Sequence, residues 1–190
     1  MKKVFLLAIV CIAFSSLSAQ EFPKMDASPM DAAYFPVRAT YRAFAKTEEE
    51  KKAAEPQIRV LYSRPQAKGR DVFPGLQKYG EVWRVGANES TEIMFFNDVK
   101  VNGSTVKAGR YTMYIVPQEK EWEVHISTDL DGWGQYAFDP ARSTIAKITV
   151  PTEKTAATVE ALSILFEAKD PGAHMIIAWD DTMVRVPIEI

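Results

Sequence analysis

Arginines and aromatic residues gather in residues 63–90, and two more aromatic residues lie within residues 133–136. Guanidinium groups offer planar pairs of donors that suit carboxylate or phosphate oxygens, and aromatic rings offer flat apolar faces. Aromatic faces beside a few polar groups are typical of sites for sugars or small ligands. The candidate ligand contacts are Arg64, Arg70, Trp83, Arg84, Asn88, Glu89, Trp133 and Tyr136.

The same residues have a structural interpretation, in which they fasten a long loop to the body of the protein. Arg84 could pair with Glu81 or Glu89, and Trp83 could belong to the core. A loop as long as residues 63–90 needs anchors of its own, so we favour fastening over ligand binding. The two interpretations differ in whether the candidate residues converge on one concave surface.

Motifs for catalysis are sparse in the sequence. His125 and His174 are not brought together by any motif, and we expect His125 on the solvated face of a strand. There is no nucleophile elbow, phosphate loop or dinucleotide fingerprint. Glu81 and Glu89 form the one carboxylate pair in the long loop that could support glycoside hydrolysis. We therefore lean towards a protein that is not an enzyme, and keep a hydrolase as an alternative.

Metal chemistry has equally little support. The single cysteine, Cys11, lies in an N-terminal apolar run, so a His/Cys zinc cluster is excluded once that run is removed. Asp180-Asp181 lacks the spacing of a calcium loop and predicts a hairpin turn. We expect no metal and no cofactor.

The N-terminus is typical of an export signal. Lys2 and Lys3 precede an apolar run over residues 4–14, and small residues follow up to Ala19. This order predicts a secretory signal peptide over residues 1–19, too short to span a bilayer, which takes about 20 apolar residues. We expect cleavage after Ala19 and a periplasmic or extracellular protein, with no membrane span after cleavage.

Composition narrows the class of partner. The formal net charge of the 190 residues is −2, and apolar residues make up 47%, enough for a core without disulfides. An acidic balance argues against nucleic acid, which needs a basic face. The expected partners are a small molecule, a glycan or an envelope protein.

Period-two alternation of apolar residues from Gln57 onward predicts strands. Turn signals such as Asn102-Gly103 and Pro171-Gly172 separate them. Many short strands without a helical pattern indicate an all-β fold, an antiparallel β-sandwich or jelly roll of about ten strands with one long ordered loop. The strands are expected at residues 58–63, 91–96, 98–101, 111–116, 121–127, 145–150, 161–166, 175–179 and 183–190.

Residues 20–56 differ from the rest and are expected to form an N-terminal arm before a domain over residues 57–190. Residues 33–35 could be a short strand that Pro36 stops. The charge run over residues 48–52 could form a helical turn with Glu and Lys paired, but a solvated loop is favoured.

Two short blocks carry a family resemblance: Tyr62-Ser63-Arg64-Pro65 and Gly86-Ala87-Asn88-Glu89. With Tyr79 to Arg84, Trp133 to Tyr136 and the ending Val186-Pro187-Ile188, the chain resembles domain-of-unknown-function family 2911 over residues 57–190. Val85 departs from the threonine expected there. The resemblance implies an exported bacterial β-sandwich and implies no reaction.

Three hypotheses follow for the function. The first is a non-catalytic binding module for a glycan or a small acidic molecule. The second is a structural or accessory envelope protein that acts through a protein partner, with residues 20–56 as a docking arm. The third is a hydrolase that uses Glu81 and Glu89, which requires their side chains to share one environment.

Overall fold

The computed structural model describes residues 21–134, 136 and 139–190. Nine strands in this part of the chain form one antiparallel sheet in the order β1-β2-β3-β6-β7-β8-β9-β4-β5. The strands are β1 (Met30–Phe35), β2 (Ile58–Ser63), β3 (Thr91–Phe95), β4 (Val99–Val101), β5 (Ser104–Val106), β6 (Gly109–Pro117), β7 (Glu121–Ser127), β8 (Thr144–Lys169) and β9 (Gly172–Glu189). The predicted all-β antiparallel class is confirmed, with nine described strands where about ten were expected.

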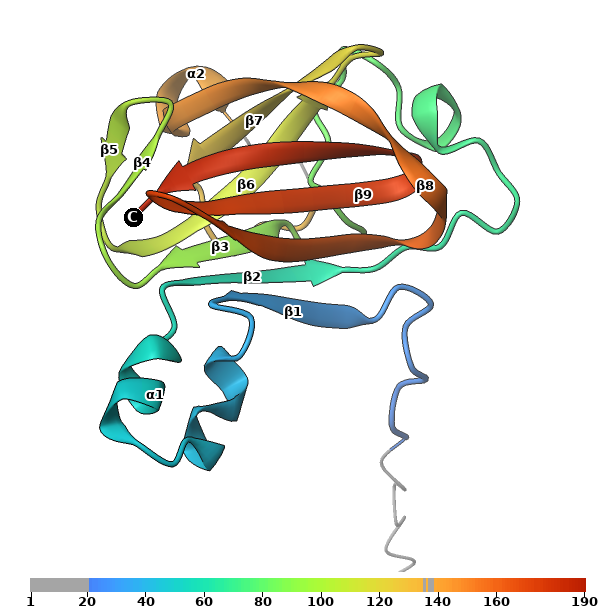
Figure 1. Ribbon diagram of the computed structural model, residues 1–190. Coiled ribbons are helices and arrows are strands. Elements are labelled where there is room, and N and C mark those ends of the chain that lie inside the picture. The colour runs from blue at the N-terminus through green and yellow to red at the C-terminus, as the bar shows by residue number, and fades with distance from the viewer. Residues whose placement is uncertain (1–20, 135, 137–138) are drawn as a thin grey trace, which may run out of the picture.

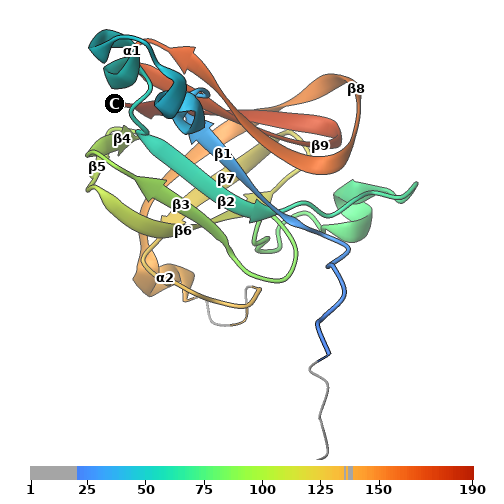
Figure 2. The same ribbon diagram turned by 90° about the horizontal axis from the view of Figure 1, so that it is seen from below.

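The sheet forms two layers because it folds over on itself along β8. Residues 144–151 of β8 pair with β7, whereas residues 163–169 pair with the start of β9. Figure 1 shows β8 leaving the side of β7 and bending back with β9 across the other strands. The second layer, formed by the rest of β8 with β9, β4 and β5, covers the first, which is also clear in Figure 2.

β8 and β9 are each longer than the sequence predicted, and each merges two expected strands. Asp180-Asp181, expected as a hairpin turn, lies inside β9 instead. Asp180 has a φ of 57°, and the pairing of β9 with β8 shifts register on both sides of Val159, opposite Asp180. A β-bulge of this kind strengthens local twist, so the long ribbon bends without ending.

The core lies between the two layers and follows the predicted alternation. Ile58, Val60 and Tyr62 of β2 all point inward and are at most 3% exposed. The largest fully buried side chains come from several strands, and include Trp122, Tyr114, Phe95, Ile58 and Ile93. Because successive residues of a strand point to opposite faces, each strand can supply one face to the core.

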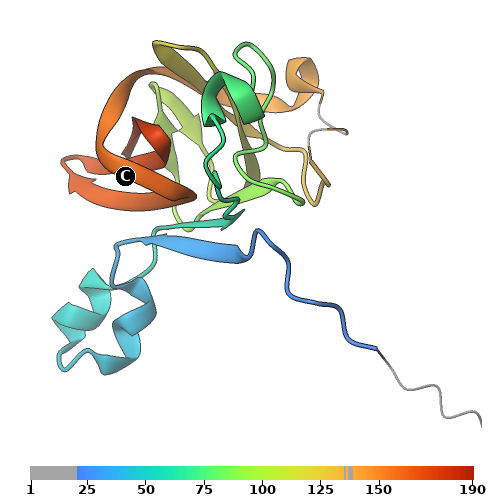
Figure 3. The same cartoon turned by 90° about the vertical axis from the view of Figure 1, so that its right-hand side faces the viewer.

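The N-terminal region contributes both a strand and two short helices. β1 pairs with β2 from Met30 to Phe35, so part of residues 20–56 belongs to the sheet. The 3₁₀ helix η1 (Ala39–Phe44) and the helix α1 (Glu48–Ala53) follow, and they project from the sandwich (Figure 3). The prediction of a solvated loop over residues 48–52 was wrong, because these residues form most of α1. Thr47 caps the helix by accepting from the Glu50 N–H at 3.1 Å.

The long loop over residues 64–90 is ordered and contains the irregular turn η2 (Val72–Leu76). It begins along the edge of β8 that faces away from β9. The Ala67 N–H donates to the carbonyl of Glu160 at 2.8 Å, and the Leu162 N–H donates to the carbonyl of Pro65 at 3.0 Å. The loop therefore covers part of a sheet edge that would otherwise be unpaired.

Candidate functional site

Trp83, the first of the aromatic candidates, belongs to the core. It is 3% exposed, and its backbone forms a β-bridge with Ile115 of β6. Its ring stacks on Trp179 at 5.9 Å and meets Trp122 and Phe73 edge-on at 5.7 and 5.6 Å. Such aromatic packing contributes stability beyond area burial, so Trp83 anchors the long loop.

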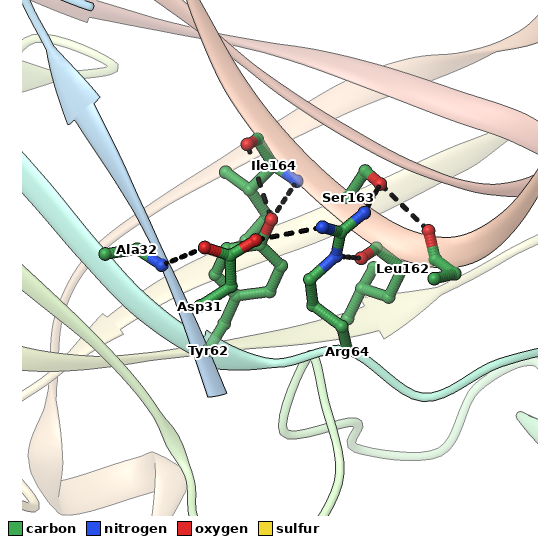
Figure 4. Close-up of polar contacts among 8 residues, drawn as sticks. Asp31, Ala32, Tyr62, Arg64, Leu162, Ser163 and Ile164 are labelled. Carbon is green, nitrogen blue, oxygen red and sulfur yellow. Dashed lines mark hydrogen bonds and ion pairs between the residues drawn. The ribbon is translucent and has the colours of Figure 1, made fainter. Parts of the chain in front are cut away.

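Arg64 connects β1 to the free edge of β8, which is the edge that does not pair with β9, and we call this contact region the seam (Figure 4). Its Nη1 pairs with Asp31 of β1 at 2.9 Å, its Nε donates to the carbonyl of Leu162 at 3.0 Å, and its Nη2 donates to Ser163 Oγ at 2.8 Å. These protein acceptors use the planar guanidinium donors that a ligand carboxylate would need.

Arg70 holds its own loop together. Its Nε donates to the carbonyl of Ala67 and its Nη2 to the carbonyl of Gln66, both at 2.8 Å. Protein acceptors therefore take donors of both Arg64 and Arg70, and Trp83 is buried in the core.

The remaining five candidates come together where residues 84–90 meet residues 130–136, and we call residues 84–90 and 130–134 the loop pair. The Gly134 N–H donates to the carbonyl of Asn88 at 2.8 Å. Ser90 Oγ donates to the carbonyls of Gly132 and Gly134 at 3.1 and 2.6 Å. These bonds fix two loops that are more than 40 positions apart in the sequence.

Arg84 and Tyr136 both lie close to Gly134. A Cβ atom on Gly134 would lie 2.9 Å from Arg84 Nη1 and 3.0 Å from the Tyr136 ring. Its φ of +68° is in the left-handed region that favours glycine. The absence of a side chain at Gly134 therefore allows the guanidinium and the aromatic ring to come close.

Glu89 and Trp133 lie directly opposite each other in an antiparallel β-bridge. Side chains at opposite positions project from the same face, with Cβ atoms about 5 Å apart. Trp133 is 60% exposed, although its backbone is held by the bridge. The bridge thus fixes the backbone beneath an exposed indole ring.

A hollow of about 280 Å³ adjoins this bridge. Its floor is a row of cross-strand neighbours, Leu61, Glu92 and Thr112, on the outer face of β2, β3 and β6. The loop pair forms its wall through residues 89–90 and 130–132. The hollow is thus built by the sheet and bordered by the bridge that holds Trp133.

Arginines balance most of the acidic charge in the hollow. Glu92 accepts from Arg59 Nη2 at 2.9 Å and pairs with Arg110 Nη1 at 3.3 Å. Arg110 Nη2 also pairs with Asp131 at 2.8 Å. Glu89 is exposed and forms no ion pair with a residue that the structure describes. Glu89 therefore offers an exposed carboxylate beside a hollow whose other carboxylates are paired with arginines.

The residues required for hydrolysis do not come together. Glu81 lies beside the β6–β7 connection, where the Gly80 N–H donates to the carbonyl of Pro117, and pairs with Lys78 at 3.9 Å. Glu89 instead lies against Trp133 in the loop pair. The two carboxylates occupy separate environments, which removes the basis for the hydrolase hypothesis.

His125 is buried, not solvated as the strand pattern predicted. It is 8% exposed, and its ring stacks on Tyr114 at 4.6 Å. Burial lowers the pKa of His125, and the hydrogen bond between its Nε2 and Glu123, at 3.1 Å, acts in the opposite direction. His174 lies on β9 opposite Glu167, so the two histidines are on different strands.

Within the described part of the chain, no cluster of three or more His, Cys, Asp or Glu side chains is arranged to hold a metal ion. No described helix is both long and apolar enough to cross a lipid bilayer.

Some residues of the hollow were not identified from the sequence. Ser90, Glu92, Arg110 and Asp131 come from a loop end, two strands and a second loop. Alternation along residues 91–96 does place Glu92 on the face opposite Ile93. Its pairing with Arg110 depends on β3 lying beside β6, which a local pattern does not show.

No curated protein and no solved structure matches the chain. The family described as "Protein of unknown function (DUF2911)" matches residues 45–188. Both blocks that carried the resemblance lie within this range and meet in the structure, since a Cβ on Gly86 would lie 3.2 Å from the carbonyl oxygen of Ser63. The chain therefore belongs to the family of proteins of unknown function DUF2911.

Proposed function

We propose that this protein is an exported, non-catalytic binding protein whose loop pair takes a neutral, hydroxyl-rich ligand of the glycan class. The observation that carries the proposal is the bridge between Glu89 and Trp133. It holds an exposed indole face and an open carboxylate on one surface, next to a hollow lined by polar groups. Stacking on Trp133 would remove apolar sugar C–H surface from water, and Glu89 would accept from hydroxyl groups.

A glycan suits this surface better than the small acidic molecule that the arginines of the sequence suggested. Arg64 and Arg70 donate to protein oxygens, and Arg110 is paired with Glu92 and Asp131. An acidic ligand would meet the Glu89 carboxylate, whereas the hydroxyl groups of a sugar can donate to it.

Ligand-induced stabilisation of the folded chain tests the proposal. The chain from Gln20 onward is screened by thermal shift against neutral oligosaccharides, acidic sugars and small carboxylates. A ligand that binds only the folded state at a hundredfold excess over Kd adds about 2.7 kcal/mol of stability. Neutral oligosaccharides are expected to raise the unfolding midpoint, and small carboxylates to leave it unchanged.

Two variants test whether a ligand that raises the unfolding midpoint binds at the loop pair. Trp133→Ala and Glu89→Gln should each remove the shift without lowering the midpoint of the free protein, because both side chains are exposed. Phe44→Ala is the matched control, since it removes another exposed aromatic side chain, on η1. A shift that survives both loop-pair variants, or one seen only with carboxylates, would refute the proposed site.

Export rests on the N-terminal pattern and has its own test. The mass of the protein recovered from the cell envelope or medium should correspond to a chain that begins at Gln20. Recovery of the full-length chain in the cytoplasm alone would contradict export.

A further inference from the structure

The region between β1 and β2 forms a structure of its own, which we call the helical arm (residues 36–56). It contains η1 and α1 and projects from the sandwich (Figures 1 and 3). Ala39 is the one buried residue of η1, and α1 has none. The buried core cluster of the described residues includes no member of the arm. The arm is therefore not needed to complete the hydrophobic core.

Large apolar side chains of the arm face solvent. Val37, Tyr41 and Phe44 are 63%, 59% and 77% exposed. The rings of Tyr41 and Phe44 are 6.5 Å apart and lie three residues apart on η1, which brings them to the same face. Neighbouring exposed apolar side chains of this size mark a surface that contacts a partner.

The first half of the arm is basic. Residues 36–46 contain Arg38, Arg42 and Lys46 and no carboxylate, whereas residues 47–56 contain four glutamates and two lysines, so the arm as a whole carries five cations and four carboxylates. None of these three side chains forms an ion pair with a residue that the structure describes. Cations that the protein leaves unpaired, beside exposed aromatic rings, are complementary to a partner that is both anionic and apolar.

Cations and rings also share one hollow. A space of about 390 Å³ between η1 and α1 is lined by Arg38, Tyr41, Phe44 and Lys46, together with Glu50. One Glu50 oxygen accepts from the Lys46 backbone N–H at 2.6 Å, so this carboxylate keeps its charge in the hollow. Basic and apolar groups thus share one surface with a single carboxylate.

We propose that the helical arm docks this protein onto the surface of an anionic lipid bilayer. Aromatic rings favour the headgroup level of a bilayer, and Lys and Arg side chains are attracted to anionic headgroups. Residues 21–29, which carry Phe22 and Met25, 81% and 88% exposed, leave the sheet at the other end of β1, where Met30 pairs with Ser63, so the docking surface is formed by the arm alone.

The position of the arm leaves the loop pair free. The arm joins the end of β1 to the start of β2, at Phe35 and Ile58. The long loop that leads to the loop pair leaves from the opposite end of β2, after Ser63. A protein docked through the arm would hold the proposed ligand surface away from the bilayer.

Vesicle co-sedimentation tests the docking. The chain from Gln20 onward is used, since its core residues all lie between Ala33 and Ile188 and the apolar leader would itself bind lipid. Vesicles of phosphatidylcholine with added phosphatidylglycerol should bind the protein, and vesicles of phosphatidylcholine alone should bind it much more weakly. Binding should weaken as salt is raised, because screening reduces the attraction between charges.

Two double variants separate the contributions of charge and apolar contact. Arg38→Gln/Arg42→Gln should weaken partitioning by about fivefold for each cation, or about 25-fold together. Tyr41→Ser/Phe44→Ser should remove most binding at high salt, where the apolar contact remains. The matched control, Lys68→Gln/Lys120→Gln, removes two exposed cations from loops beyond the other ends of the strands and should leave partitioning unchanged.

Three results would overturn the proposal. The first is a lack of binding to phosphatidylglycerol vesicles by the unaltered chain, and the second is equal loss of binding in the arm and control double variants. The third is self-association that Tyr41→Ser/Phe44→Ser abolishes without any vesicle binding, which would assign the surface to a second copy. All variants should keep the unfolding midpoint of the unaltered chain, because the arm lies outside the core.

Discussion

The hydroxyl group of Tyr62 on β2 hydrogen-bonds to both backbone groups of Ile164 on β8. It accepts from the Ile164 N–H at 2.9 Å and donates to the Ile164 carbonyl at 3.5 Å. A side chain thereby takes the place of a neighbouring strand along the free edge of β8 (Figure 4). Together with Arg64, Tyr62 joins the two layers where the sheet does not close.

Tyr62→Phe should destabilise the protein by about 1–3 kcal/mol, because it leaves the backbone groups of Ile164 buried without a partner. The ring itself is 3% exposed and would keep its packing. Urea unfolding measures the change in the free energy of unfolding. Tyr34→Phe is the matched control, since the Tyr34 hydroxyl makes no hydrogen bond to another residue that the structure describes and the side chain is half-buried on β1. Equal losses in the two variants would contradict the role of the Tyr62 hydroxyl.

Arg64→Gln should also lower the free energy of unfolding, because Arg64 links Asp31 to residues about 100 positions away. We expect a loss of about 1–3 kcal/mol, mainly from the carbonyl and hydroxyl acceptors left unsatisfied. Arg70→Gln serves as the comparison, since Arg70 bonds only to carbonyls three and four residues before it. The same urea titration should show a smaller loss for Arg70→Gln, and a larger one would refute this account of the seam.

The two loop tryptophans should respond in opposite ways to truncation. Trp83→Ala removes a ring packed among Phe73, Trp122 and Trp179 and should cost about 3–5 kcal/mol of stability. Trp133→Ala removes a ring that is 60% exposed and should leave the unfolding midpoint nearly unchanged. Thermal unfolding followed by circular dichroism compares them, and a large loss for Trp133→Ala would mean that this residue fastens the loop and does not bind ligand.

A comparison of Gly134→Ala with Gly69→Ala isolates the effect of crowding around Gly134. Both have nearly the same φ, +68° and +70°, so an alanine carries a similar backbone strain, about 1 kcal/mol, at either position. A Cβ on Gly69 meets nothing within 4 Å, whereas a Cβ on Gly134 meets Arg84 Nη1 at 2.9 Å. Gly134→Ala should therefore destabilise the protein more and also weaken ligand binding. Equal losses in urea unfolding would show that Arg84 moves aside without cost.

His125 should make stability depend on pH. Burial lowers its pKa in the folded state, so the unfolded chain takes up a proton first as the pH falls. The stabilising effect of the neutral ring is fully present above the unfolded pKa of about 6.5 and declines as the pH falls towards the folded pKa. His125→Phe retains a ring beside Tyr114 but cannot titrate, so its unfolding midpoint should fall less between neutral and mildly acidic pH.

His174→Gln is the control for that titration, because it removes the other histidine of the chain. It should retain the pH dependence of the unaltered protein. A pH dependence that persists in His125→Phe and disappears in His174→Gln would reverse the assignment.

The sequence by itself determined the fold class and most of the strands. Alternation in β2 and β7 follows from the two faces of a strand, and the side chains it places inward, such as Val60 and Val124, are buried. The family was also visible in two short blocks, Tyr62-Ser63-Arg64-Pro65 and Gly86-Ala87-Asn88-Glu89, which lie within the matched residues 45–188. Local patterns sufficed for most of the strands, where the structure repeats every two residues, but not for the short helix α1.

Tertiary structure decided which of the eight candidates lie together. Arg64 and Glu89 are both charged residues of one long loop in the sequence, yet one is used at the seam with β8 and the other lies open beside Trp133. His125 is on the face that alternation marks as polar, but Tyr114 and the neighbouring strands bury it. These outcomes depend on contacts between residues apart in the chain, such as those of Arg64 that form when β8 folds over the first layer, and no local spacing encodes them.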